Sequence, residues 1–200
     1  MKKGVIISIV LLLIAGAALF MWQRTMDPRG RAVAGEIDGA ALVLRGNALR
    51  APDSSPEQTI AAANGSLGLT VLPNQPPPTP AERGVRILIS AEHAARINDR
   101  PVAVEIDYTL PASGAASGLA VSLQGIAPAD WFSRPLDQSG RARFELPAQI
   151  AVDAIGLRAL SDQPGASGAL SITEIRILPG AEPQEAQAPA ESEPEAEPAP

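Results

Sequence analysis

From residue 84 to residue 179, apolar and polar residues alternate with a period of two in one short segment after another. The clearest segment is 102–109, where every second residue is a large apolar one. The other alternating segments are 85–90, 119–124, 141–146, 155–159 and 170–177. Turns such as Ser139-Gly140 separate them. Because a period of two gives a strand one apolar and one polar face, this pattern predicts an all-β antiparallel sandwich with one solvated face on each sheet.

Two local signals refine this prediction. Within 170–177 the apolar residues change parity between Ile172 and Ile175, which predicts a β-bulge near Thr173-Glu174. The segment 91–97 has the length of a single helical turn placed between two strands. No long amphipathic helix is visible elsewhere, so the domain is expected to be built from strands.

The segment before residue 84 carries weaker strand signals. Two short apolar stretches, 40–45 and 66–72, lie on either side of Asn64-Gly65, a pair that is typical of type I′ hairpin turns. The Pro-rich run 73–80 does not fit the interior of a strand or a helix, because Pro lacks the amide donor. We therefore expect a hairpin near Asn64-Gly65, followed by a stiff, extended surface loop.

The N-terminal segment has the composition of a membrane anchor. Lys2-Lys3 precedes an unbroken run of apolar or small residues, 4–22, and about 20 such residues span a hydrocarbon core. A cleaved signal peptide is the alternative, because 5–14 followed by Ala15-Gly16-Ala17 fits its outline. The apolar residues beyond that site favour an uncleaved anchor. The chain has no cysteine, which excludes a lipidated N-terminus.

Basic residues flank the anchor on both sides. Lys2-Lys3 favours a cytoplasmic N-terminus, whereas Arg24, Arg29 and Arg31 lie close on the other side, so the positive-inside bias nearly balances. The short N-terminal stub and the large domain that follows favour an N-in, C-out insertion. In a bacterium we therefore expect a single-pass inner-membrane protein whose folded domain lies in the periplasm.

Composition divides the chain into four parts: an anchor at 1–23, a juxtamembrane spacer at 24–31, a β-sandwich domain at 32–179 and an acidic tail at 180–200. The tail is almost entirely Ala, Pro, Glu and Gln, without apolar periodicity, so we expect it to be disordered. The negative charges of its six glutamates add up to the formal net charge of the whole chain, −6. Because no basic stripe stands out in the domain, a nucleic-acid partner is not expected.

The order and spacing of the expected strands over 84–179 resemble those of the galactose-binding-like jelly rolls that occur among carbohydrate-binding modules. The segments that carry the resemblance are Val85-Arg-Ile-Leu-Ile89, 96–108, 120–124, Trp131-Phe132, 143–147 and 172–179. The resemblance implies a jelly-roll β-sandwich to which 32–72 contributes edge strands. Such domains bind sugars, bind proteins or space other domains, so the resemblance selects no single function.

Trp131-Phe132 is the one aromatic cluster in the sequence of the domain. Trp131, with Asp130 and Arg134 close to it in the sequence, forms a candidate ligand site, because an exposed indole stacks on a sugar ring while charged groups bind its hydroxyls. The alternative is that Trp131 and Phe132 point to opposite faces of a strand, and one of them caps the core. The domain has only two further aromatic residues, Tyr108 and Phe144, which leaves little for a stacking platform.

Metal and acid–base candidates are few. His93 is the sole histidine, and we expect it in a solvated loop, without the partner that a general base needs. With no second His and no Cys, a zinc site is not expected. Asn98-Asp99 and Asp137 are calcium candidates on loops, but no spaced acidic motif supports them. The sequence therefore predicts no metal site.

Glu105 and Asp107 share one strand face, which is typical of surface ion pairs opposite an arginine such as Arg86. No phosphate-binding loop, nucleophile elbow or dinucleotide motif occurs, so we expect neither an enzyme nor a cofactor. The leading hypothesis is a non-catalytic, membrane-anchored envelope protein whose sandwich binds or scaffolds another protein or membrane complex. The alternative is a membrane-tethered carbohydrate-binding module for an envelope glycan. The expected contacts are membrane lipid through 4–22, an envelope protein and, in the alternative, a glycan.

Overall fold

The computed structural model describes residues 35–50, 54, 58–60, 65–71, 76–163, 165 and 167–180. The predicted anchor at 1–23, the spacer at 24–31 and, apart from Gly180, the tail at 180–200 lie outside the described residues and stay predictions. In the part of the chain that the structure describes, no helix combines the length and the apolar character that crossing a membrane requires.

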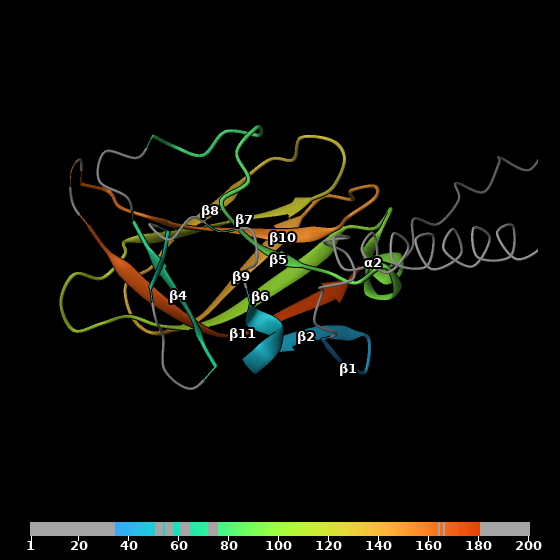
Figure 1. The fold of residues 1–200 in the computed structure, drawn as a ribbon, viewed down its shortest axis with the longest axis horizontal. Helices are drawn as coiled ribbons and strands as arrows, with labels where there is room; N and C mark the ends of the chain where they lie inside the picture. Colours follow the sequence, from blue (N-terminus) through green and yellow to red (C-terminus); the bar gives the residue numbers. More distant parts are fainter. Residues whose placement is uncertain are drawn as a thin grey trace, which may run out of the picture.

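The described residues form two antiparallel sheets packed face to face (Figure 1). The strands of the seven-stranded sheet are β1 (Glu36–Asp38), β2 (Ala41–Arg45), β3 (Thr59–Ile60), β4 (Leu67–Thr70), β6 (Val102–Thr109), β9 (Gly140–Leu146) and β11 (Ala169–Pro179). The four-stranded sheet runs in the order β5 (Val85–Leu88), β10 (Ala154–Leu160), β7 (Gly118–Gln124) and β8 (Phe132–Pro135). The prediction of an all-β antiparallel sandwich is therefore confirmed.

The longest strand, β11, organises the larger sheet. Along one edge it pairs first with β4 and then with β2, and along the other edge it pairs with β6. The register with β6 shifts between Ile172 and Glu174, so the predicted bulge is confirmed. The bulge turns the apolar residues on both sides of it toward the core, and both Ile172 and Ile175 are fully buried.

A hairpin is found near the predicted position, because β3 and β4 pair across the connection that contains Gly65, but 40–45 is not part of it. β2 instead pairs with β1 through a tight turn at Gly39-Ala40, where Gly39 has a φ of 60° that glycine adopts at little cost. β4 pairs with β3, so the connection that contains Gly65 joins those two strands. The sequence does not show that β2 and β4 both pair with a distant strand, β11, one after the other along the same edge.

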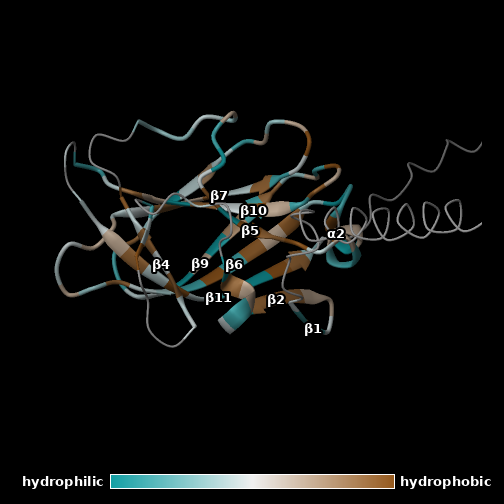
Figure 2. Ribbon diagram, viewed as in Figure 1, coloured by the Kyte–Doolittle hydropathy of each residue, from teal (hydrophilic) through white to brown (hydrophobic). Residues whose placement is uncertain are grey.

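The inner faces of both sheets form one hydrophobic core. In Figure 2 the hydrophobic residues concentrate on the strands, whereas hydrophilic residues dominate the connecting loops. Tyr108 and Phe144 are buried in this core, and Phe132 packs against it. Ile155 and Leu157 on β10 face the core from the smaller sheet, as their parity predicts. Three of the four aromatic side chains of the domain are therefore used for packing.

The outer face of the seven-stranded sheet is the solvated face that the sequence predicts. Glu105 and Asp107 lie opposite arginines of β9: Arg141 binds Asp107 at 2.6 Å and Arg143 binds Glu105 at 3.0 Å. The hydrogen bond from Arg141 holds the pKa of Asp107 below its usual value of 3.8. Arg86, proposed above as their partner, lies in the other sheet, so that part of the prediction is wrong.

The outer face of the four-stranded sheet is covered, contrary to the prediction of a solvated face on each sheet. Every residue of β7 and nearly every residue of β10 is buried. Its outward side chains include Arg86, Ser122, Gln124 and Arg158, and all four are more than nine-tenths buried. Residues 76–84, called the strap below, pass over this face on the side away from the larger sheet (Figure 1).

The short helix α2 (Ala91–Ile97) follows β5, and a 3₁₀ helix, η2 (Gly46–Leu49), follows β2. The predicted helical turn at 91–97 is thus confirmed. His93 lies in this helix and is buried, so its expected place in a solvated loop is wrong. The Ser90 hydroxyl accepts a hydrogen bond from the His93 amide as an N-cap and lies 2.8 Å from His93 Nδ1. His93 is a packed structural residue.

Candidate functional site

The strap is fastened to the covered sheet by side chains that reach its backbone. Arg158 donates to the carbonyl of Pro76 and pairs with Glu82. Gln124 Nε2 donates to the carbonyl of Arg83 at 2.8 Å. The Pro-rich composition suits this role, because prolines offer carbonyl acceptors, need no amide partner and lose little entropy when fixed. The described part of the predicted stiff, extended loop, residues 76–80, is therefore a cover for a polar sheet face.

Trp131 belongs to the same cover. Its indole N–H donates to the carbonyl of Thr79 at 3.0 Å, which satisfies the one polar atom of the side chain. Its ring lies over two glycines, since a Cβ built on Gly84 or Gly156 would come within 2.8 Å or 3.1 Å of it. Trp131 and Phe132 thus lie on opposite faces of the smaller sheet, and Phe132 is the one that packs against the core.

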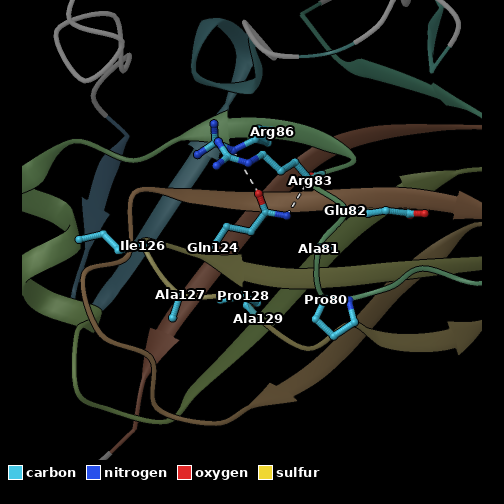
Figure 3. Close-up of a pocket in the computed structure, with 11 residues that line it drawn as sticks. Pro80, Ala81, Glu82, Arg83, Arg86, Gln124, Ile126, Ala127, Pro128 and Ala129 are labelled. Carbon is cyan, nitrogen blue, oxygen red and sulfur yellow. Dashed lines mark hydrogen bonds between the residues drawn. The ribbon is translucent and has the colours of Figure 1, made fainter.

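A cleft of about 120 Å³ opens between the strap and the loop that follows β7 (Figure 3). Its floor contains Arg86 and Gln124, which are both buried. One wall is the strap from Pro80 to Arg83, and the other is the small, apolar segment 125–129. Buried polar side chains converge at this cleft, and we treat it as the candidate functional site.

The floor of the cleft is held in place by hydrogen bonds. Arg86 Nε donates to Gln124 Oε1 at 3.1 Å, and Arg86 Nη2 forms an ion pair with Asp153 at 2.8 Å. Gln124 also holds the strap, so one amide links the floor to the wall (Figure 3). A guanidinium and an amide fixed in this way are pre-organised, because little side-chain entropy remains to be lost on binding.

A second buried arginine lies under the strap. The side chain of Arg158 is only 3% exposed. Burial lowers the pKa of its guanidinium, and the neighbouring Glu82 carboxylate opposes that shift. A guanidinium stays protonated at neutral pH even so, and the Glu82 carboxylate balances its charge. This ion pair therefore fixes the strap over the sheet electrostatically as well as through hydrogen bonds.

The structure does not bring the three predicted ligand residues together. Trp131 is half-buried under the strap, whereas Asp130 and Arg134 are exposed. Arg134 lies in β8 opposite Leu119 and shares the parity of Phe132, on the other side of the strand from Trp131. Asp130 follows the segment 125–129 directly but is not among the residues that line the cleft. Whether any of the three contacts a ligand stays a prediction.

The calcium candidates are also apart. Asn98 Oδ1 accepts a hydrogen bond from the amide of Val152 and so fixes a loop, and Asp99 and Asp137 lie on different loops. Over the described ranges, no group of three or more His, Cys, Asp or Glu side chains converges as a metal site would require.

Sequence reasoning missed Arg86 and Gln124 as site residues. Each has a polar side chain at the outward parity of a strand, which is ordinarily taken as a solvated position. A stronger signal was available: Arg158 repeats the pattern on the strand between them, and a Pro-rich segment precedes β5 directly. Polar residues across adjacent strands, next to a stretch unable to form a strand, indicate a covered polar face.

No family model matches the sequence, and no curated protein matches it. Two solved structures are similar to this chain at low sequence identity. One is BiXyn10A CBM1 in its apo form, with 10% identity and a TM-score of 0.42 over 63% of this chain and 84% of that one. Another is the low-affinity xylan-binding module CBM86 of Roseburia intestinalis, with 14% identity and a TM-score of 0.44 over 71% and 97%. Both are carbohydrate-binding modules, the class of domain that the sequence resembles.

Proposed function

We propose that this chain is a non-catalytic, membrane-tethered recognition domain of the bacterial envelope that binds a saccharide in the cleft. In this proposal the anchor at 4–22 holds the protein in the inner membrane, and the sandwich lies in the periplasm. The observation that carries the proposal is the cleft itself. Its floor presents a fixed guanidinium and a fixed amide, and one of its walls is apolar. Sugars combine hydroxyl groups with apolar C–H patches, and such mixed walls suit them.

The size of the cleft limits the ligand. At about 120 Å³ it is smaller than the roughly 300 Å³ or more of pockets that enclose drug-sized ligands. It suits one sugar ring or the end of a longer glycan. Trp131 supports this site and does not stack on the ligand, because its N–H is bonded to Thr79 and its ring covers Gly84 and Gly156.

The leading hypothesis from the sequence, a scaffold for another envelope protein, has less support. Its basis is the anchor and the acidic tail, which lie outside the described residues. The largest exposed sheet face of the described part carries ion pairs within the protein, such as Arg141 with Asp107 and Arg143 with Glu105. A partner protein would have to replace or desolvate these pairs, which brings little net gain. We therefore favour saccharide binding over protein scaffolding as the function of this domain.

The proposal is tested by applying the detergent-solubilised full-length protein to a glycan array, beside two cleft variants. Gln124→Ala removes the floor amide, and Ile126→Ser changes an exposed rim residue without affecting packing. A matched control, Thr109→Ala, alters an exposed position on the larger sheet. We expect binding to one group of glycans in the wild type and the control, and weaker binding in both cleft variants. Silence of the wild type, or equal binding by all four proteins, would refute the saccharide function.

A further inference from the structure

Exposed large apolar side chains gather at one end of the sandwich. β5 and β7 end there, β10 begins there, and α2 leads from β5 to the start of β6 at the same end. We call it the α2 end. Ile126 is 82% exposed and Ile150 is 61% exposed, and both lie on loops of this end. In the described part of the chain, the large apolar side chain exposed near the opposite end is Ile60, on the edge strand β3.

The two loops that carry these isoleucines are in direct contact. A Cβ built on Gly125 would come within 2.4 Å of the Ala151 carbonyl oxygen and 2.8 Å of the Ile150 carbonyl oxygen. The amide of Asp153 donates to the carbonyl of Gln124 at 2.8 Å, which ties the second loop to the end of β7. The exposed isoleucines therefore belong to one surface.

Two residues with a strained backbone lie in the loops of the α2 end. Ala151 and Asp99 are the non-glycine residues of the described part with positive φ, at 51° and 60°. Asp99 donates its amide to the carbonyl of Gln149, and Asn98 accepts from the amide of Val152, so the two strained residues belong to linked loops. Such conformations cost free energy and persist where the surroundings enforce them. Here they lie in the loops beside Ile150, whose apolar side chain is exposed where a polar residue is ordinarily found.

The chain itself indicates what covers this surface. Twelve residues separate Trp22, at the end of the apolar N-terminal run, from Gly35, where the described domain begins. Such a link extends at most about 3.5 Å per residue, so the proposed anchor would keep Gly35 within roughly 45 Å of the membrane surface. β1 lies near the α2 end, because its last residue, Asp38, pairs with the first residue of β2, and β2 pairs with the last part of β11. A bilayer surface is the apolar partner within reach of that link.

We propose that the α2 end rests on the bilayer, with Ile126 and Ile150 inserted in the interfacial region and the mouth of the cleft among the lipid headgroups. Ile126 lines the cleft as well as the α2 end, so the two surfaces are continuous. The inference rests on the proposed anchor and narrows the proposed ligand to saccharides carried at the membrane surface. Each inserted isoleucine removes apolar area from water and stabilises the contact.

The absence of cysteine from the chain permits a direct test. Single variants Ile126→Cys, Ile150→Cys, Arg83→Cys and the control Ile60→Cys are made in the full-length protein, labelled with a polarity-sensitive fluorophore and inserted into phosphatidylcholine nanodiscs. The lipids carry a nitroxide quencher either on the headgroup or on the acyl chain. Exposed positions tolerate these changes, so folding is preserved.

The proposal predicts blue-shifted emission for labels at 126 and 150, with quenching by acyl-chain nitroxides. It predicts headgroup quenching for the label at the cleft rim, at 83, and aqueous, unquenched emission at 60. Equal, aqueous emission from 126, 150 and 60 would overturn it while leaving saccharide binding on the array intact. Quenching of the label at 126 without headgroup quenching of the label at 83 would contradict the restriction of the ligand to saccharides carried at the membrane surface. If the protein does not insert into the nanodiscs, the proposed membrane anchor and this inference are both refuted.

Discussion

Replacing Gly156 with Ala tests how the covered face of the smaller sheet works. Gly156 lies in β10, pairs with Arg86 on one side and Ser122 on the other, and points away from the core. An added Cβ would lie 2.2 Å from Gln124 Nε2 and 3.1 Å from the Trp131 ring. Such contacts force the Gln124 side chain to move, whereas its neighbours on the core side are not touched.

The expected cost follows from the bonds that Gln124 makes. Moving it breaks its donation to the Arg83 carbonyl and its acceptance from Arg86 Nε. Two hydrogen bonds contribute about 1 kcal/mol each, and displacement of Trp131 adds an overpacking cost of about 1 kcal/mol. The lower entropy of an unfolded chain with Ala returns about 0.4–1 kcal/mol. We therefore expect the free energy of unfolding to fall by about 2 kcal/mol.

The assay is urea denaturation in detergent, with Trp131 fluorescence as the probe. Trp22 and Trp131 are the two tryptophans of the chain, so a Trp22→Phe background isolates Trp131. The matched control is Gly140→Ala, where an added Cβ meets nothing within 4 Å. Gly156→Ala should lower the midpoint and red-shift the emission, and the control should do neither. A Gly156→Ala midpoint that matches the control, with unchanged emission, would refute the packing described for Gln124 and Trp131.

Three further predictions concern other parts of the chain. Ser122→Ala should raise the free energy of unfolding by about 1 kcal/mol, because the buried hydroxyl has no hydrogen-bond partner in the structure, and a lower urea midpoint would contradict this. Asp107→Asn should cost less than about 1 kcal/mol at neutral pH, since this ion pair is partly exposed. Because Arg141 lowers the pKa of Asp107, that stability is present above the unfolded value of 3.8 and is lost as pH falls through the folded pKa, so urea midpoints of the two proteins should converge in acid. Intact mass of the membrane-extracted protein should include residues 1–23, and a chain that begins after Ala17 would contradict the retained anchor.

The alternation of apolar and polar residues within a segment was enough to predict the individual strands and the bulge. The strand at 102–109 and the bulge beside Glu174 follow from parity alone, because burial on one face fixes which residues point inward. The ion pairs of Asp107 were predicted in kind, as cross-strand contacts with an arginine. Their partner was named wrongly, since the sequence does not show that β9, which carries Arg141, lies beside β6.

The cleft could not be predicted from parity, because its residues carry the parity of a solvated face. Arg86 and Gln124 are buried only because the strap, a segment without strand or helix, crosses over them. A contact of this kind joins a loop to strands distant in sequence and has no periodic signal. His93 was misplaced for a related reason: a helix of seven residues gives too short a pattern to show which of its side chains face the core.

Hydrogen exchange of the full-length protein, measured with and without a glycan that the array selects, tests the central claim most directly. If a saccharide occupies the cleft, amides in 80–86 and 124–129 should exchange more slowly on binding, while those of β9 stay unchanged. Protection confined to the larger sheet, or no change in either cleft segment at saturating glycan, would contradict the assignment of this cleft as the saccharide site.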